Sequence, residues 1–401
     1  MPNDRFLLIK AGSHNLWGNV NHLMEQLLAA EITKRIPVVY WGTNCLYDGT
    51  IYNNAFDLYF EPISPYTAYE LMNPKYTCYP KIWEYDNLMS DDPDRLKLTY
   101  RNTGDMMTSE ANVVVSDVST PMKHMIPWIS REHPAYGMTP IQIYRYLYRK
   151  YLKIKPDIEE EIREFYDAKL KNEDPVLAVH MPGDFTHGIY PQLGVYYRFV
   201  SLDMLEHKEI HRDRHDTFQY DETTYLHEIA RILDVTPSQD PYKLYHPEIR
   251  KLLGRFGIKK IFLITDREDI LEEYMKSYGS MLVFGKYKRI DKNDPGSGSH
   301  LENHLNKRSK GIENIKDAYL ASKCAFFIGY GSSNLSHAAT RLKDWSESNI
   351  KLAYWMFEKL HNFSCEFMKT GRHSPEESDG KCRMYVKQAR DTIKRIQRIL
   401  K

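Results

Sequence analysis

Short apolar runs alternate with helical patterns along the chain. In the first half, apolar residues recur at near-helical spacing between residues 18 and 35, and a second helical pattern runs over 140–166. Bounded apolar runs of about four to eight residues are typical of buried strands. They predict strands over 6–9, 36–41 and 111–118. The order of strand, helix and strand at the start of the chain predicts a βαβ unit.

The second half repeats this alternation. Its apolar runs predict strands over 176–180, 258–265, 281–284 and 325–329. Helices are predicted after Asp266 as far as Tyr278, over 314–322, and from the turn at 330–333 onward. Strands that alternate with helices at this spacing are typical of a parallel sheet with helices on both faces. The predicted fold class is therefore α/β, with a Rossmann-like sheet in each half.

A chain of 401 residues is long enough for two domains. We place the boundary near residue 170, where a charged run precedes the strand 176–180. The predicted domains are an N-terminal domain over 1–170 and a C-terminal domain over 171–385. Residues 386–401 are predicted to form a basic amphipathic helix, which either packs against the body of the protein or lies on an anionic membrane surface. A loop rich in glycine and serine is predicted over 291–311.

The overall charge and the cysteines narrow the class of protein. The 55 basic and 54 acidic residues give a net charge of +1, so the chain as a whole has no attraction for nucleic acid. Five cysteines without a close pair favour a reducing compartment. No run approaches the ~18 apolar residues of a membrane span. We expect a cytoplasmic protein, with peripheral membrane contact through the C-terminal helix as an open possibility.

The turn after the strand 325–329 is a candidate phosphate site. It contains Gly331, Ser332, Ser333 and Asn334 and leads into a helix. Glycines, hydroxyls and the N–H groups of a helix N-terminus together form a neutral cradle for a phosphate. In open α/β sheets, ligands bind at the carboxyl ends of the strands. The alternative is a serine N-cap with glycines that only allow a tight turn.

Two other strand ends carry polar side chains. Asp266 follows the strand 258–265 and is either a ligand of a ribose or base, or a plain helix N-cap. His180 ends the strand 176–180, and Gly183, Asp184 and His187 follow it. Asp184 and His187 are the candidates for a catalytic base, because carboxylates and imidazoles accept protons. The alternative is that the histidines are structural.

The loop after the first strand is a weaker candidate. Asn15, Gly18 and Asn19 lie there at the start of a helix, where glycine allows close approach of a ligand. The loop does not match GxGxxG, which disfavours a dinucleotide enzyme. The sequence predicts no metal site. The histidines at 207, 211 and 215 have the spacing of one helix face, but their charged neighbours favour a solvated surface.

Several patches of the sequence resemble one family of glycosyltransferases. Leu16, Tyr40-Trp41-Gly42, 53–56 and 60–63 are similar to the start of the bacterial nodulation α-1,6-fucosyltransferases, which are related to the animal core α-1,6-fucosyltransferase. In the second half, 261–266, 311–324 and 327–338 are similar to the later blocks of that family, in the same order. The patches cover about half of the chain.

This resemblance implies a GT-B fold, in which two Rossmann-like domains face a central cleft. It also implies an inverting mechanism without metal or other cofactor. The nucleotide-sugar donor, a GDP-sugar, would be bound mostly by the C-terminal domain, and the N-terminal domain would lie on the acceptor side. Carried over by position, the donor-site candidates are His180, Asp266, Asp317, Ser332 and Ser333. In the family an arginine two residues after the histidine meets the donor pyrophosphate. Pro182 stands at that position here, so either another cation such as Arg212 or Arg214 replaces the arginine, or the donor differs.

The resemblance and the strand-end residues together favour a glycosyltransferase. It would move a sugar, with fucose as one candidate, from a nucleotide donor to a glycan or a lipid-linked glycan. Two alternatives stay open at this stage: a non-catalytic nucleotide or sugar binder on the same fold, and a sugar-nucleotide epimerase. The missing arginine is the main argument for the first of these.

Overall fold

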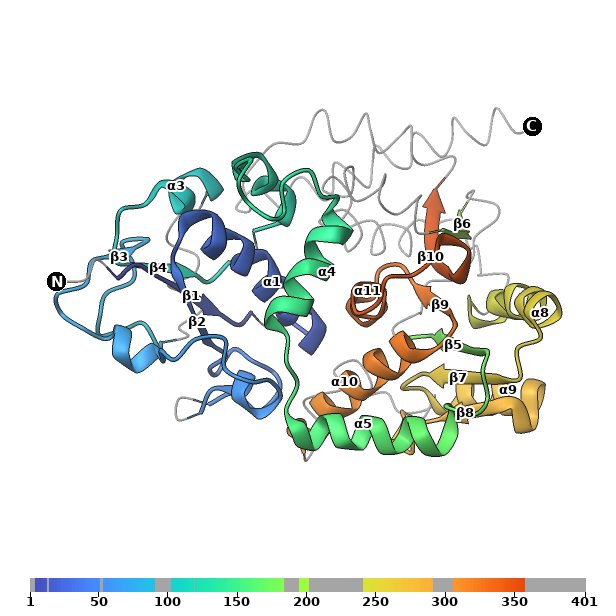
Figure 1. Cartoon of the computed structure of the whole chain (residues 1–401). Helices are drawn as coiled ribbons and strands as arrows, with labels where there is room; N and C mark the ends of the chain where they lie inside the picture. The colour runs from blue at the N-terminus through green and yellow to red at the C-terminus, as the bar shows by residue number, and fades with distance from the viewer. Residues whose placement is uncertain are drawn as a thin grey trace, which may run out of the picture. The chain divides into compact units, whose positions relative to one another are not determined.

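Two parallel sheets organise the chain, as Figure 1 shows. The computed structural model describes residues 4–12, 14–50, 53–90, 102–118, 120–183, 195–201, 241–290 and 306–357. The predicted α/β class with a parallel sheet in each half is thus confirmed. The site and the pocket discussed below belong to one compact unit, formed by Met1–Gly183, Phe199–His211 and Pro247–Ala353. The domain boundary at residue 170 and a cleft between the domains stay predictions, and the predicted helix 386–401 lies outside the described residues.

The N-terminal sheet has four strands in the order β2-β1-β4-β3. Its strands are β1 Phe6–Lys10, β2 Ile36–Tyr40, β3 Cys78–Tyr79 and β4 Val113–Ser116. All of its pairings are parallel. β1 lies in the interior of the sheet and is buried along its whole length, as an uninterrupted apolar run predicts. Parallel pairing places the carboxyl ends of β1, β2 and β4 at one edge.

Helix α1, Leu16–Thr33, connects β1 to β2. Asn15 caps it by accepting the Gly18 N–H, and Lys34 ends it in the left-handed conformation with φ 54°. The predicted single helix over 140–166 is wrong, because the chain forms α4, Pro140–Tyr151, and α5, Pro156–Lys169. Proline lacks an N–H group and forces the residue before it out of the helical region. Pro156 therefore begins a new helix.

The C-terminal sheet has six strands in the order β6-β10-β9-β5-β7-β8. Its strands are β5 Val176–His180, β6 Val195–Val200, β7 Lys260–Ile264, β8 Leu282–Phe284, β9 Phe326–Tyr330 and β10 Ile350–Phe357. β5 is central and pairs in parallel with β7 on one side and β9 on the other. His180 lies opposite Ile264 in this register. The residues that follow β5, β7 and β9 therefore leave the sheet at the same edge.

The remaining helices connect and cover the strands. They are α3 Thr103–Thr108, α8 Tyr245–Phe256, α9 Glu268–Tyr278, α10 Lys307–Lys323 and α11 Asn334–Arg341. Short 3-10 helices span Ala55–Leu58, Ala68–Leu71, Met122–His124, Ile126–Trp128, Pro241–Leu244, Gly279–Met281 and Glu347–Asn349. α10 packs against both α5 and α11. It begins at Lys307 rather than near 314, because Asn306 caps it by accepting the Ser309 N–H, so the end of the predicted loop 291–311 is helical.

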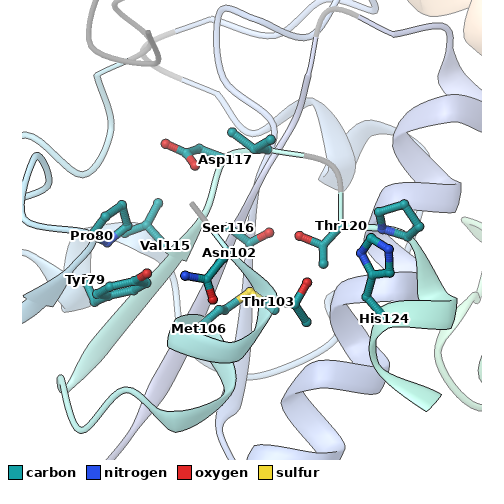
Figure 2. Close-up of a pocket in the computed structure, with 12 residues that line it drawn as sticks. Tyr79, Pro80, Asn102, Thr103, Met106, Val115, Ser116, Asp117, Thr120 and His124 are labelled. Atoms are coloured by element: carbon teal, nitrogen blue, oxygen red, sulfur yellow. The ribbon is translucent and has the colours of Figure 1, made fainter. Parts of the chain in front are cut away.

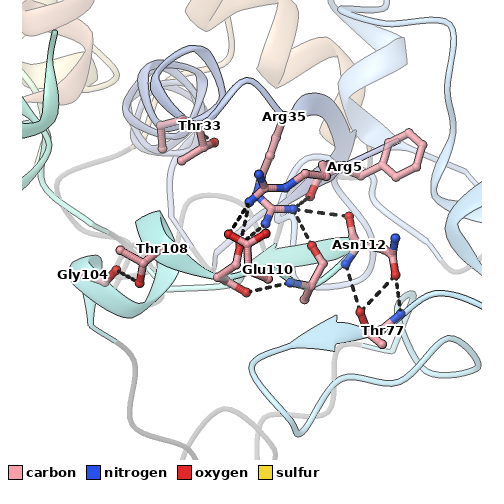
Figure 3. A network of polar contacts seen from close by, with 12 residues as sticks. Arg5, Thr33, Arg35, Thr77, Gly104, Thr108, Glu110 and Asn112 are labelled. Atoms are coloured by element: carbon pink, nitrogen blue, oxygen red, sulfur yellow. Dashed lines mark hydrogen bonds and ion pairs between the residues drawn. The ribbon is translucent and has the colours of Figure 1, made fainter. Parts of the chain in front are cut away.

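Two arginines bind backbone carbonyl oxygens at the edge of the N-terminal sheet where its strands begin (Figure 3). The buried Arg35 guanidinium donates to the carbonyl oxygens of Phe6, Ala111 and Ser109 at 3.2, 2.8 and 2.5 Å. Arg5 donates to the same Ser109 oxygen at 2.7 Å. Burial, and next the positive charge of Arg5, lower the pKa of Arg35 to about 10. These contacts tie β1, β2 and the segment before β4 together.

Candidate functional site at the carboxyl edge of the C-terminal sheet

The segments that follow β5 and β7 lie close together. The Met181 N–H donates to the Ile264 carbonyl at 2.9 Å, so the two chains stay paired as they leave the sheet. A Cβ on Gly183 would lie 2.6 Å from Asp266 Oδ1 and 2.9 Å from Arg267 Cγ. Only glycine fits so close to another residue without displacing it. The predicted site residues Gly183 and Asp266 are therefore neighbours in space, although 83 positions separate them in the sequence.

His180 is joined to the helix that follows β9. Its Nδ1 lies 2.8 Å from Ser336 Oγ, and this same oxygen accepts the Tyr330 N–H at 3.0 Å. His180 is buried, and burial lowers its pKa to about 3. The imidazole is therefore neutral near pH 7 and offers a hydrogen bond rather than a positive charge. Ser336 ties the ends of β5 and β9 to one another through this contact.

Some backbone N–H groups in the turn between β9 and α11 already have acceptors within the protein. The Gly331 N–H donates to the Ala353 carbonyl at 2.8 Å, and the Ser333 N–H donates to the Tyr330 carbonyl at 3.0 Å. Ser333 is the N-cap residue of α11, and its side chain makes no capping hydrogen bond. The N–H groups in the first turn of any helix have no acceptor within that helix. Of the groups predicted to bind a phosphate, the N–H groups at the start of α11 and the hydroxyls of Ser332 and Ser333 are therefore the ones that remain.

Asp317 lies on α10 and is buried. Burial raises its pKa to about 7, with smaller opposing effects from Lys310 and Arg289, and Tyr287 donates a hydrogen bond to it. Arg289 donates to the Thr265 carbonyl at 3.2 Å, and the neighbouring Ile290 N–H donates to the Asp266 carbonyl at 2.8 Å. Asp317 therefore belongs to the same polar region as the end of β7, and its carboxyl is partly protonated near neutral pH.

The loop after β1 has a structural role in the described contacts. Asn15 caps α1, and its Oδ1 also accepts a hydrogen bond from Asn334 Nδ2 at 3.2 Å. Asn19 Oδ1 accepts the Gly12 N–H at 2.9 Å and holds the loop against α1. A Cβ on Gly18 would lie 3.1 Å from Asn334 Nδ2. The structure therefore brings Asn15 and Gly18 together with Asn334, one of the predicted donor-site residues.

Some predicted residues cannot be placed, and some residues of the site were not predicted. Asp184, His187, Arg212 and Arg214 lie outside the described residues. Three residues of the site were not predicted from the sequence. Ser336 contacts His180, Tyr287 contacts Asp317, and Arg289 donates to the carbonyl of Thr265, the residue before Asp266. A weak signal existed for Arg289, because it is a cation a few residues beyond the short strand β8. No pattern links Ser336 to His180, because the contact joins elements that are far apart in the sequence.

Among the residues that the structure describes, no three His, Cys, Asp or Glu side chains are grouped as metal ligands would be. Within that part, no helix is long and apolar enough to cross a membrane.

Comparison with solved structures gives matches over most of the chain. A NodZ α-1,6-fucosyltransferase soaked with GDP-fucose is 15% identical, with a TM-score of 0.45, and the match covers 88% of this chain and 99% of that one. A complex of POFUT1 with GDP-fucose is 15% identical, with a TM-score of 0.47, and the match covers 86% and 96%. The chain is similar to these fucosyltransferases in its α/β fold. The fucosyltransferase NodZ from Bradyrhizobium matches in the same way, with 16% identity, a TM-score of 0.43 and coverage of 84% and 92%. No protein-family model and no curated protein sequence matches the chain.

Proposed function

We propose that this chain is a glycosyltransferase that uses a GDP-sugar as donor. The observation that carries the proposal is the meeting of His180, Gly183 and Asp266 with the start of α11 at the carboxyl ends of β5, β7 and β9. This edge of an open α/β sheet is where nucleotide ligands bind. The resemblance of the surrounding sequence to α-1,6-fucosyltransferases supports GDP as the nucleotide and fucose as the sugar.

The diphosphate and the nucleoside of the GDP-sugar need different protein groups. The start of α11, with Ser332 and Ser333, suits the diphosphate, because helix N–H groups and the helix dipole favour negative charge. Asp266 and Asp317 suit the ribose and the base, whose hydroxyl and amino groups donate hydrogen bonds. His180 supplies a neutral hydrogen-bonding group between these two regions.

Arg289 is our candidate for the positive charge that the missing arginine would supply. Its guanidinium donates to the carbonyl oxygens of Thr265, Gly285 and Tyr287 at 3.2, 2.8 and 3.3 Å. Carbonyl oxygens hold the side chain in place without cancelling its charge. Arg267 is a weaker candidate, because Asp269 binds it through both carboxylate oxygens at 2.8 and 2.6 Å. We propose that Arg289 acts through its electrostatic potential on the donor phosphates.

The proposed reaction is inverting transfer to a glycan acceptor without a metal ion. Protein groups would then stabilise the leaving diphosphate. GDP release from GDP-fucose and GDP-mannose, and transfer of the sugar to a set of glycan acceptors, would test this reaction. Turnover is expected to be the same with and without EDTA. Loss of turnover that Mg²⁺ or Mn²⁺ restores would contradict the metal-free mechanism.

The same assay separates the alternatives. GDP binding, without release of GDP from the donor and without sugar transfer, would favour a non-catalytic binder. The missing arginine is the argument for that alternative. Conversion of the nucleotide sugar without release of GDP would favour an epimerase. Release of GDP together with a heavier glycan product is the outcome that the proposal expects.

Asp184 and His187 remain our candidates for the base that accepts the proton of the acceptor hydroxyl. Proton transfer to a positioned base contributes about 100- to 10,000-fold to the rate of the catalysed reaction. Asp184→Asn or His187→Ala is therefore expected to lower kcat by roughly 100-fold or more, with little change in the affinity for GDP. If both variants keep a kcat near that of the parent chain, neither residue is the base.

A further inference from the structure

The hydroxyl of Ser336 lies between the ends of two neighbouring strands. Ser336 is on α11 and is buried. A Cβ on Gly329 of β9 would lie 2.5 Å from Ser336 Oγ, so a side chain at that strand position would displace the hydroxyl. Glycine is the residue that leaves this room. The packing of α11 on β9 therefore keeps the Ser336 oxygen at a defined place, beside His180 at the end of β5.

The two hydrogen bonds of the Ser336 side chain determine where its own hydrogen points. The Oγ atom accepts the Tyr330 N–H at 3.0 Å and lies 2.8 Å from His180 Nδ1. A backbone N–H can only donate, so it uses one lone pair of the serine oxygen. The Ser336 side chain has no third hydrogen-bond partner among the described residues. Within that part of the chain, His180 Nδ1 is therefore the one acceptor for the serine hydrogen.

This contact distinguishes the two neutral forms of the His180 ring. With the proton on Nε2, Nδ1 accepts the Ser336 hydroxyl, and every group in the contact has a partner. With the proton on Nδ1, that nitrogen would donate to Ser336 Oγ, and the serine hydrogen would have no acceptor among the described residues. A buried hydroxyl without an acceptor is costly, so the contact favours the form protonated on Nε2 by roughly fivefold or more.

The Nε2–H group is then the part of His180 that can bind a ligand. His180 is only 4% exposed, and its Nε2 has no hydrogen-bond partner among the residues that the structure describes. A buried N–H group needs an acceptor. The oxygens of a diphosphate accept hydrogen bonds and have none to donate near pH 7, so they would be attracted by Nε2–H and repelled by a bare ring nitrogen. The position of one proton on His180 thus decides whether the ring favours such an oxygen.

We infer that Ser336 is a positioning residue, which keeps His180 in the form protonated on Nε2 so that the ring donates a hydrogen bond to an oxygen of the bound nucleotide sugar. The inference rests on the proposed function for the identity of the ligand. The position of the proton follows from contacts within the chain alone. Ser336 acts through His180, because the hydrogen bond to one ring nitrogen fixes which nitrogen carries the proton.

Nitrogen-15 NMR of the histidine rings on the full chain at pH 7 tests the position of the proton. The chain has 16 histidines, so the spectrum of His180→Gln identifies the signals of His180. In the parent chain we expect a protonated, pyrrole-type Nε2 and an unprotonated, pyridine-type Nδ1. Ser336→Ala and Ser336→Cys are expected to raise the share of the other form roughly threefold or more, since alanine has no donor and a thiol is a weak one. Ser336→Thr, which keeps the hydroxyl, should restore the parent pattern.

Thr340→Val is the matched control for these variants. It removes another buried hydroxyl from α11, one that donates to the His337 carbonyl at 2.7 Å, and it should leave the signals of His180 unchanged. Calorimetric titration of GDP on the same samples measures the consequence for the ligand. Ser336→Ala is expected to weaken GDP binding by roughly three- to tenfold, and Ser336→Thr to bind GDP as the parent chain does.

Two results would overturn the inference: a proton on Nδ1 in the parent chain, or an unchanged ring in both Ser336→Ala and Ser336→Cys. Cysteine is close to serine in shape, so its variant decides the question if the alanine variant is unstable. The expected form of His180 in a chain that does not bind GDP would contradict the donor assignment alone. GDP binding by a chain whose His180 carries its proton on Nδ1 would contradict the role of Ser336 alone.

Discussion

Ser333→Asp is expected to weaken binding of a GDP-sugar by roughly 30- to 150-fold. Ser333 begins α11 at the edge where we place the diphosphate. A carboxylate at this position would repel the phosphates by about 2–3 kcal/mol at the effective dielectric constant of a protein surface. Calorimetric titration of GDP, at one fixed salt concentration, measures the change.

Ser333→Asn is the matched control for this prediction. Asparagine has nearly the same shape as aspartate, and both are good N-cap residues, so neither change should destabilise α11. The Ser333 side chain makes no capping hydrogen bond that the substitutions would remove. The Asn variant is expected to bind GDP within a few-fold of the parent chain. Equal affinity of the Asp and Asn variants would remove the start of α11 from the donor site.

Acidification from pH 6.5 to 4.5 is expected to destabilise the protein through its buried histidines. Burial lowers the pKa of His180 to about 3 and, as its first cause, the pKa of His22 to about 4. Between pH 6.5 and 4, both residues bind a proton in the unfolded chain but not in the folded one. Each therefore lowers the free energy of unfolding by about 1.4 kcal/mol for every pH unit below 6.5.

Asp317 has the opposite effect on the free energy of unfolding as the pH falls. Burial raises the pKa of this carboxyl to about 7, so the folded protein takes up a proton there well above pH 3.8, where the unfolded chain does so. It therefore adds about 1.4 kcal/mol to the free energy of unfolding for every pH unit between 7 and 3.8 as the pH falls. The three groups together predict a loss of about 3 kcal/mol between pH 6.5 and 4.5.

Urea unfolding of two variants at both pH values isolates these contributions. His180→Asn removes one titrating group and is expected to reduce the loss of stability by about 3 kcal/mol relative to the parent chain. Asp317→Asn removes the opposing group and is expected to increase the loss by a similar amount. Comparison with the parent chain cancels the contributions to the pH dependence from titrating groups that all three proteins share. The same pH dependence in all three would show that neither residue is buried as described.

Seven of the ten described strands were predictable because local composition determines them, whereas β3, β6 and β10 were not predicted. The strand over 176–180 was predicted with the bounds that the structure has, since an apolar run there follows Pro175 and precedes Pro182. The break between α4 and α5 was missed, although Pro156 marks it, because the helical pattern continues on both sides. The two-residue strand β3 has too few positions to show any periodicity.

The candidate site was predictable in part. Residues at strand ends, such as Gly183 and Asp266, can be chosen from the sequence because parallel strands place their carboxyl ends at one edge. Their partners cannot, since the contact of His180 with Ser336 depends on how α11 packs beside β5. A pocket at the carboxyl edge of the N-terminal sheet, lined in part by Tyr79, Asn102 and Ser116 (Figure 2), escaped prediction for the same reason, because its lining comes from three separate segments.

The most direct test of the donor assignment is a thermal-shift comparison of GDP, UDP, TDP and CMP on the full chain. A ligand that binds only the folded state raises the melting temperature, by an amount set by its concentration relative to its Kd. We expect GDP to raise Tm more than the other nucleotides, and at one fixed GDP concentration we expect Ser333→Asp to reduce the shift strongly while Ser333→Asn keeps it. No shift with any nucleotide, or a shift with UDP or TDP but not GDP, would contradict a GDP-sugar transferase.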